Sequence, residues 1–197
     1  MADERLSEIS RETRETRIHL CLRLDGSGLV NADTGVPFLD HMVSQLAMHG
    51  LFDLEVTCQG DTEVDDHHSV EDVGIVLGQA FKRALGDKVG ITRYGSQMMP
   101  MDETLALVAL DLSGRSLLVY DVDLPAARVG HFDTELVPEF LRAFAHNARL
   151  TLHVKLIHGS NTHHIIEAIF KGLGRALRQA VARDPRQSKV ASTKGVL

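Results

Sequence analysis

The chain has 197 residues, 44% of them hydrophobic, and a formal net charge of −6, which suits one or two small globular domains. This acidic balance argues against the basic face that nucleic-acid binding normally needs, although it leaves room for local basic clusters, so we expect no nucleic-acid partner. The first ten residues are charged and no apolar run reaches membrane length, while the two cysteines lie far apart without CxxC spacing. We therefore expect a cytoplasmic protein without membrane contact, disulfide framework or cysteine zinc site.

The first half of the chain predicts two strands, a helix, a strand and a second helix. Segments 16–26 and 27–35 alternate as strands do around a turn marked by glycine. Apolar residues recur at helical spacing over 37–49 and 66–85, with Pro37 suited to a helix start and Gly50 and Gly86 to helix ends. Segment 51–61 between the helices reads as another strand.

The second half repeats this order and ends in a polar tail. Segments 90–100, 103–112, 116–124 and 149–160 read as strands, and 134–147 and 162–182 as helices. The tail breaks helical period at Pro185 and reads as an extended loop. We predict an α+β fold with helices on one face of a small sheet, divided into repeats at 1–90 and 91–184 and a tail at 185–197.

Two copies of the pattern His-His-x-x-Glu identify the repeats. His67 to Glu71 and His163 to Glu167 share this pattern, the helical period that follows and the strand that precedes, all at one constant offset. The earlier helices also align, and they pair His41 with Glu139. A lone histidine on a helix is more often a core or surface residue than a ligand, but two equivalent copies make coincidence a poor explanation.

These side chains have the spacing of metal ligands. Residues four apart share a helix face, whereas neighbouring residues point about 100° apart, so the second histidine of each pattern must serve a different ion. If the halves pack about a pseudo-twofold axis, two equivalent sites form from nitrogen and oxygen donors, which suit Mn, Fe or Zn. The sets that we favour are His41, His68, His163 and Glu167 for one ion, and Glu139, His164, His67 and Glu71 for the other.

Other functions fit parts of the pattern. Two close metals can activate water in a hydrolase, and His-His-x-x-Glu is loosely similar to the helices of zinc proteases, but this leaves the repeats and the tail unexplained. The histidines can also belong to a metal-storage or structural protein. The acidic stretch 61–66 lacks the glycine and the final glutamate of a calcium loop, so we interpret it as a solvated turn.

Several longer motifs occur in order along nearly the whole chain: FLDHM at 38–42, DDHHSVED at 65–72, PMDE at 100–103, NTHHIIEAIFK at 161–171 and STKGVL at the end. Together they resemble the imidazoleglycerol-phosphate dehydratase family. The resemblance implies a duplicated β/α unit similar to domain 2 of ribosomal protein S5. It also implies trimers packed into a twenty-four-subunit shell, with active sites between subunits that each hold two Mn²⁺ ions.

The resemblance assigns roles residue by residue. It implies the same metal ligands as the symmetry argument, although the family can also use histidine at the position of Glu139. It makes Glu15 the catalytic carboxylate and places it, with His49, against the substrate. Further substrate contacts, largely to a phosphate, are implied for Arg93, Arg115, Lys171, Ser192, Thr193 and Lys194, each of which reads by composition alone as a solvated surface residue.

The implied activity is that of a lyase of histidine biosynthesis, which dehydrates D-erythro-imidazoleglycerol phosphate to imidazole acetol phosphate. An imidazole held by two Mn²⁺ ions ionises more easily, and the imidazolate can expel the hydroxyl next to the ring. Removal of the neighbouring proton then yields an enol that becomes the ketone. We expect Glu15 to move that proton.

Overall fold

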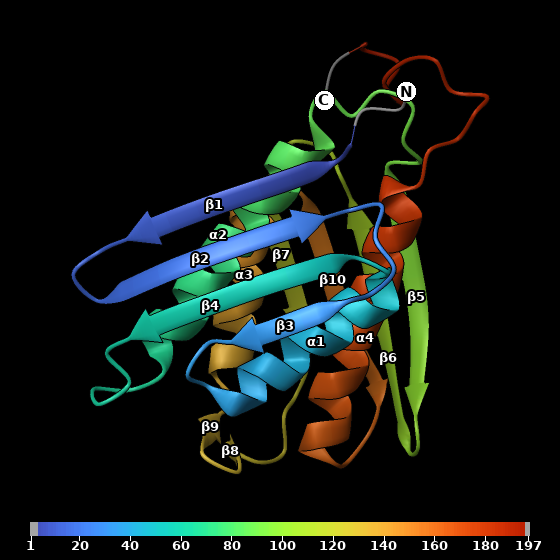
Figure 1. Cartoon of the computed structure of the whole chain (residues 1–197). Coiled ribbons are helices and arrows are strands. Elements are labelled where there is room, and N and C mark those ends of the chain that lie inside the picture. The colour runs from blue at the N-terminus through green and yellow to red at the C-terminus, as the bar shows by residue number, and fades with distance from the viewer. Residues whose placement is uncertain (1–3, 196–197) are drawn as a thin grey trace.

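The computed structural model describes residues 4–195, in which two four-stranded sheets have helices between them (Figure 1). The first half runs β1 (Leu6–Glu12), β2 (Thr16–Arg23), β3 (Val30–Asp33), α1 (Pro37–Gly50), β4 (Asp53–Gly60) and α2 (His67–Leu85). The second half runs β5 (Tyr94–Met101), β6 (Thr104–Asp111), β7 (Leu117–Asp121), β8 (Arg128–Val129), β9 (Phe132–Asp133), α3 (Leu136–Ala148), β10 (Thr151–His158) and α4 (Thr162–Val181).

The two four-stranded sheets have the same topology. Their strand orders are β1-β2-β4-β3 and β5-β6-β10-β7, so each strand of the first sheet has a counterpart in the second. In each sheet the last pair, β3 with β4 and β7 with β10, is parallel, and the other pairs are antiparallel. The predicted α+β fold with a tandem duplication is confirmed.

The helices form the middle of the molecule. Helices α1 and α2 contact the first sheet and α3 and α4 the second, while α1 packs on α4 and α2 on α3 (Figure 1). Burial alternates along β2, β4 and β6, as expected for strands with one face on a core. Each sheet thus carries helices on one face, as predicted, but there are two such sheets where the sequence suggested one. A third sheet is the short β8–β9 pair.

The contact between α1 and α4 depends on a glycine. A Cβ atom at Gly174 of α4 would lie 2.2 Å from the carbonyl oxygen of Leu46 in α1, closer than real Cβ atoms come to backbone. Without a side chain there, the two helix backbones approach closely. This approach brings the histidine of α1 within reach of the side chains of α4.

The tail contacts the start of the second half. Val190 and Arg183 make isolated β-bridges to Val89 and Ile91, and no helix or regular strand forms over 183–195. This agrees with the predicted extended loop; Val196 and Leu197 of its final motif lie outside the described residues. Among residues 4–195, no helix combines the length and apolar character that a bilayer crossing requires.

Candidate metal centre

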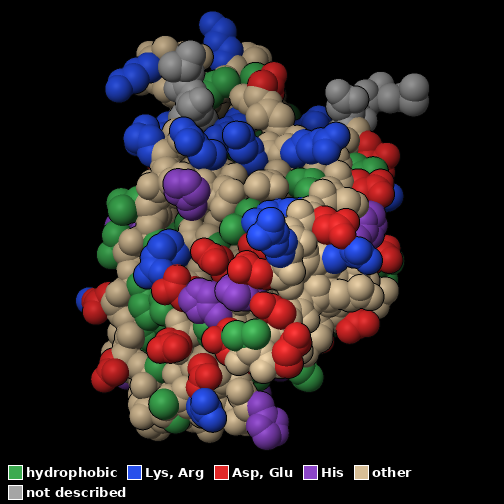
Figure 2. Space-filling model, turned by 90° about the vertical axis from the view of Figure 1, so that its left-hand side faces the viewer, with side chains coloured by type: hydrophobic (Ala, Val, Ile, Leu, Met, Phe, Trp, Pro, Cys, Tyr) green, Lys and Arg blue, Asp and Glu red, His purple; other side chains and the backbone are tan. Residues whose placement is uncertain are grey.

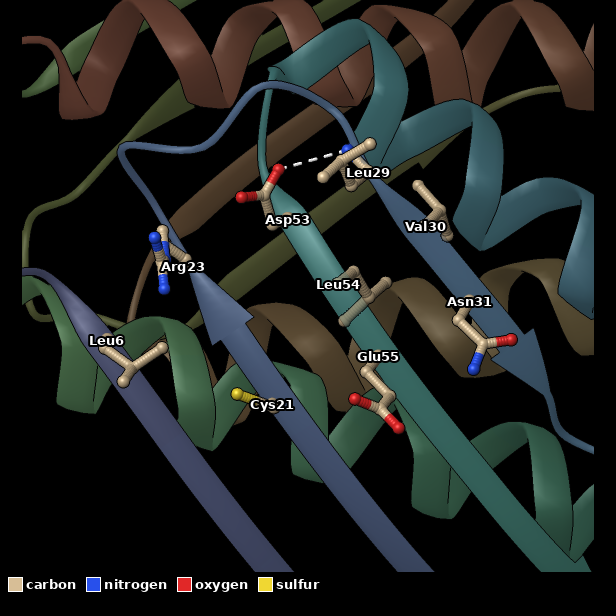
Figure 3. A pocket seen from close by; sticks show the side chains of 9 residues that line it. All are labelled: Leu6, Cys21, Arg23, Leu29, Val30, Asn31, Asp53, Leu54 and Glu55. Atoms are coloured by element: carbon tan, nitrogen blue, oxygen red, sulfur yellow. Dashed lines mark hydrogen bonds between the residues drawn. The ribbon is translucent and has the colours of Figure 1, made fainter.

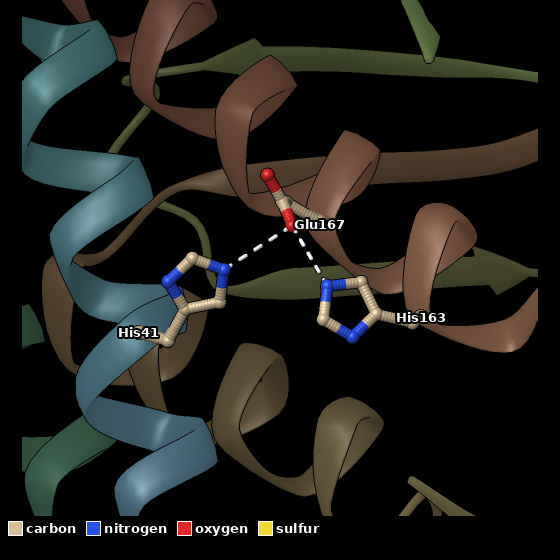
Figure 4. A group of neighbouring side chains, drawn as sticks. All are labelled: His41, His163 and Glu167. Atoms are coloured by element: carbon tan, nitrogen blue, oxygen red, sulfur yellow. Dashed lines mark hydrogen bonds and ion pairs between the residues drawn. The ribbon is translucent and has the colours of Figure 1, made fainter. Parts of the chain in front are cut away.

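Three side chains from two helices converge between α1 and α4 (Figure 4). His41 belongs to α1, and His163 and Glu167 belong to α4. One oxygen of Glu167, Oε2, lies 3.2 Å from Nε2 of His41 and 2.9 Å from Nε2 of His163. We call these three residues the ligand triad. They include three of the four residues predicted for one ion.

Local structure fixes the α4 side of the triad. The side chain of Asn161, the residue before α4, accepts hydrogen bonds from the backbone N–H groups of His163 and His164 and so caps the helix. The ring of Phe38 packs edge-on against His163, with ring centroids 5.5 Å apart. Since Glu167 lies one turn after His163, both side chains project from one face of α4.

Glu167 is a buried carboxylate surrounded by donors. Only 6% of its surface is exposed, and Nζ of Lys171 donates to its second oxygen at 2.6 Å. Burial alone would raise the pKa of Glu167, but hydrogen bonds from Lys171, His163 and His41 outweigh it and hold the pKa at about 2. Glu167 is therefore ionised at neutral pH. The half-buried His49 lies nearby, and its pKa is lowered by burial first and then by Lys171 and Arg175.

The triad fits a divalent metal ion. Its donor atoms all lie within 4.8 Å of one another, which suits a common ion with bonds of about 2.0 to 2.2 Å. Two imidazoles and a carboxylate without thiolate suit Mn, Fe or Zn. Within residues 4–195 this is the one set of three or more histidine, cysteine or acidic residues that meets this spacing.

The equivalent residues of the other helix pair do not converge in the same way. Glu139 of α3 forms an ion pair with Arg142, one turn further along the same helix. His67 and Glu71 lie one turn apart on α2, both partly buried, but no described set of three ligands includes them. The structure thus brings together three predicted ligands on α1 and α4, and leaves their counterparts apart.

The remaining two predicted ligands, His68 and His164, each contact carboxylates; we call them the outer histidines. Nδ1 of His68 lies 3.0 Å from Asp61, and its Nε2 lies 3.8 Å from Glu15. Nδ1 of His164 lies 2.8 Å from Glu103. Hydrogen bonding to Asp61 and Glu103 is the largest effect on these histidines, and it raises both pKa values. Figure 2 shows histidines within a ring of acidic side chains on one face of the molecule.

The predicted phosphate contacts lie mostly at the other end of α4. Arg93 donates to both oxygens of Asp111 and, through Nη1, to the carbonyl of Ala191 in the tail. Arg115 is exposed, with Nη2 3.9 Å from the same Asp111. Basic side chains also gather toward the end of the molecule that carries the termini in Figure 2. We call Arg93, Arg115 and Ser192–Lys194 the tail cluster.

A helix length separates the tail cluster from the triad. The backbone N–H of Arg93 donates to the carbonyl of Ala180, thirteen positions after Glu167 on α4. At 1.5 Å per residue this corresponds to about 20 Å along the helix axis. Lys171 is the exception among the predicted phosphate contacts, because it lies beside the triad. Within one chain, therefore, most of the predicted phosphate contacts lie far from the predicted metal ligands.

Two functional candidates were absent from the predicted site. Asp61 falls in the stretch interpreted as a solvated turn, yet its carboxylate binds His68 and is not fully exposed. Glu103 closes the PMDE motif, which carried the family resemblance without receiving a role. The motif could have indicated Glu103, but no local spacing connects it to His164, 61 residues later.

A surface hollow elsewhere does not coincide with these residues. It lies on the strands of the first sheet, and Figure 3 shows side chains of β1, β2, β3 and β4 and of adjoining residues around it. Its lining contains no histidine. A different hollow does reach the triad, since His41 and Phe38 line it together with His131 of the segment between β8 and β9.

Comparisons with known proteins agree with the motifs. The family model described as imidazoleglycerol-phosphate dehydratase matches residues 34–177. Imidazoleglycerol-phosphate dehydratase from Trichlorobacter lovleyi is 60% identical over 98% of this chain and 100% of its own length, and that from Moorella thermoacetica is 58% identical over 96% of each.

Solved structures show the same fold. The crystal structure of imidazoleglycerol-phosphate dehydratase from Staphylococcus aureus has a TM-score of 0.83 and 44% identity, covering 91% of this chain and 99% of that one. The dehydratase from Pyrococcus furiosus, solved in complex with (S)-C348, has a TM-score of 0.84 and 38% identity, covering 96% and 100%. The chain therefore belongs to the imidazoleglycerol-phosphate dehydratase family, the lyases of histidine biosynthesis.

Proposed function

We propose that the protein dehydrates D-erythro-imidazoleglycerol phosphate to imidazole acetol phosphate with two Mn²⁺ ions in each active site. The observation that carries this proposal is the ligand triad, because it presents two imidazole nitrogens and an ionised carboxylate to one point. When bound, the ions supply positive charge that makes the imidazole of the substrate easier to ionise. The other steps fall to the side chains of the protein.

We infer that each ion takes ligands from two subunits. In one chain His68 lies outside the triad, on α2 and against Asp61, although the chemistry of its ring suits the same ion. A second subunit can supply this fourth ligand. The other ion would then bind Glu139, His67 and Glu71, which are the counterparts of the ligand triad. Its fourth ligand would be the outer histidine His164. Ligands shared in this way require self-association, and we propose the trimers packed into a twenty-four-subunit shell that the resemblance implies.

We assign the proton transfer to Glu15. Its backbone is fixed, since its N–H donates to Oγ1 of Thr13 and its carbonyl accepts from the N–H of Asp61, each at 3.1 Å. Its carboxylate is half-exposed and lies 3.8 Å from Nε2 of the outer histidine His68. A carboxylate beside a metal ligand, but not itself a member of the ligand set, can accept the proton from the carbon that becomes the ketone.

We assign phosphate binding to the tail cluster together with Lys171, and a substrate contact to His49. Arginine donates two parallel bonds to phosphate, and lysine contributes a point charge. Because α4 separates the tail cluster from the triad, we infer that a substrate touching both must lie between different subunits. The segments 1–90, 91–184 and 185–197 would then act as two metal-binding repeats and a substrate-binding tail. Cytoplasmic location stays a prediction.

The test is turnover of imidazoleglycerol phosphate by the purified protein with added Mn²⁺. We expect imidazole acetol phosphate and water as products, detected by mass spectrometry. Release of inorganic phosphate in place of this product would support the hydrolase alternative. Tight metal binding without any turnover would support the metal-storage alternative.

A further inference from the structure

Both outer histidines share an arrangement that the ligand sets do not explain. Nδ1 of His68 lies 3.1 and 3.0 Å from the two carboxylate oxygens of Asp61, and Nδ1 of His164 lies 2.8 Å from Oε2 of Glu103. The carboxylates come from different places, since Asp61 follows β4 whereas Glu103 lies in the turn between β5 and β6. The two repeats therefore reach the same contact through different loops.

The contact determines which ring nitrogen can bind a metal. An ionised carboxylate only accepts hydrogen bonds, so the nitrogen facing it must carry the proton. The carboxylates nearest to Nε2, of Glu15 at 3.8 Å from His68 and of Asp102 at 3.7 Å from His164, lie beyond hydrogen-bond distance. A neutral imidazole has one N–H and one lone pair, so the lone pair is left on Nε2. Metal-binding histidines commonly donate their other N–H to a carboxylate in this way.

Glu103 is held so that it cannot turn away. Its other oxygen, Oε1, accepts from the backbone N–H groups of Ser160 at 3.2 Å and Asn161 at 2.8 Å, and from Oγ1 of Thr104 at 3.1 Å. Asn161 is also the residue that caps α4. Glu103 thus ties the ring of His164 to the same backbone that fixes the start of its helix.

We propose that Asp61 and Glu103 are positioning residues, which hold His68 and His164 in the Nδ1–H form and leave Nε2 of each ring as the metal ligand. This inference rests on the proposed function, because it assumes that the outer histidines bind the ions. It adds a residue in each repeat on which metal affinity depends although the residue does not touch the ion.

The two carboxylates respond differently to conversion into an amide. In Glu103→Gln the backbone donors hold the amide oxygen, so the NH₂ group faces His164 and forces the proton onto Nε2. In Asp61→Asn the amide oxygen can still face His68 and accept from its Nδ1–H. Asp61→Ala has no acceptor at all. A simple loss of negative charge would affect both amide variants alike.

The experiment titrates full-length, metal-free protein with Mn²⁺ and measures free Mn²⁺ by electron paramagnetic resonance. We expect Glu103→Gln and Asp61→Ala each to weaken one class of Mn²⁺ site by about 10- to 100-fold, as for other residues behind a ligand. Asp61→Asn should stay near the unmodified protein. The control is Glu63→Gln, an exposed carboxylate in the same turn as Asp61 that has no hydrogen bond within residues 4–195.

Thermal unfolding of the metal-free variants separates positioning from a merely structural role, because positioning predicts melting temperatures like that of Glu63→Gln. Mn²⁺ affinities of Glu103→Gln equal to those of the control would overturn the proposal, as would equal losses in Asp61→Asn and Asp61→Ala. If Glu103→Gln does not fold, the comparison of Asp61→Asn with Asp61→Ala tests the proposal by itself. Unmodified protein that binds no Mn²⁺ would refute the proposed function as well, whereas normal binding with unaffected variants refutes only this inference.

Discussion

The helix pairs α1/α4 and α3/α2 each take one helix from either repeat and are related to one another by the duplication, yet their ligands make different contacts. On α4, Lys171 lies one turn after Glu167 and donates to it, whereas the equivalent residue after Glu71 on α2 is Ile75. His41 of α1 faces Glu167, while its counterpart Glu139 is paired with Arg142. The two helix pairs thus share their arrangement, but the contacts that their ligands make within one chain differ.

The largest effect is expected for Glu15, whose counterpart is Glu103. Each precedes the threonine that opens the second strand of its repeat, but several donors hold Glu103, whereas the carboxylate of Glu15 lies 3.8 Å from Nε2 of His68. Glu15→Gln should lower turnover by about 10²- to 10⁴-fold, as is typical of general acid-base groups, with Mn²⁺ content unchanged. Steady-state kinetics with metal analysis tests this prediction. A wild-type rate in Glu15→Gln would mean that another residue transfers the proton.

Loss of a direct ligand should have the next largest effect. His163→Ala on α4 and His67→Ala on α2 each remove one donor, so each should weaken one of the two Mn²⁺ ions by more than about 100-fold, beyond the range for residues behind a ligand. His68→Ala should do the same. Metal content after dialysis and turnover measure the effect. If one of these variants keeps both ions and turns over normally, the histidine replaced in it is not a ligand.

Acid stability should report the ion pair that Lys171 makes with Glu167, a contact that Ile75 cannot make with Glu71. Because the pKa of Glu167 is lowered to about 2, its ionisation contributes stability that is complete above pH 4.5 and is lost as pH falls toward 2. The contribution is on the order of 3 kcal/mol, at about 1.36 kcal/mol per pKa unit. Urea unfolding of metal-free protein between these pH values should show a shallower pH slope in Glu167→Gln. A slope in Glu167→Gln equal to that of the unmodified protein would contradict this contribution.

Making the two helix pairs alike should have a smaller effect. Glu139→His gives α3 the residue type that α1 has at the equivalent position, His41. An imidazole can replace a carboxylate as a metal ligand. We expect Mn²⁺ affinity within about 10-fold of the unmodified protein, whereas Glu139→Ala should bind more weakly than Glu139→His because it offers no donor. Mn²⁺ titration compares the two variants. Equal affinities would exclude Glu139 from the second ligand set.

An effect on substrate binding alone is expected at the tail, which has no counterpart in the first repeat. Lys194→Ala should raise KM for imidazoleglycerol phosphate by about 10-fold, near the lower end for a hydrogen bond to a charged group, and leave metal content unchanged. Lys189→Ala, an exposed lysine of the same tail, is the matched control. An equal change in KM for both variants would show that only the general positive charge of the tail matters.

Local patterns were sufficient to predict the helices. The segments 37–49, 66–85, 134–147 and 162–182 all correspond to helices of the structure, because each has an apolar stripe of helical period. Strand β1 was not predicted, since its buried positions include Ser7 and its other residues are mostly polar, which hides the alternation. The pair β8–β9 has only two residues in each strand and no period to detect.

The sequence predicted only those site residues that belong to the repeated pattern. The two His-His-x-x-Glu patterns indicated the metal ligands, and the structure brings three of the predicted ligands together. The partners Asp61 and Glu103 depend on where loops meet helices, and in the second repeat the contacting residues are 61 positions apart. The pairing of Arg93 with Asp111 and the tail likewise depends on tertiary contacts that no local pattern records.

The central claim is that turnover depends on two Mn²⁺ ions held by the two duplicated ligand sets. The most direct measurement is stepwise addition of Mn²⁺ to metal-free protein while bound metal and dehydration of imidazoleglycerol phosphate are followed together. We predict negligible turnover without metal and full activity at two bound ions per chain. Full turnover of the metal-free protein in the presence of a chelator would contradict the account.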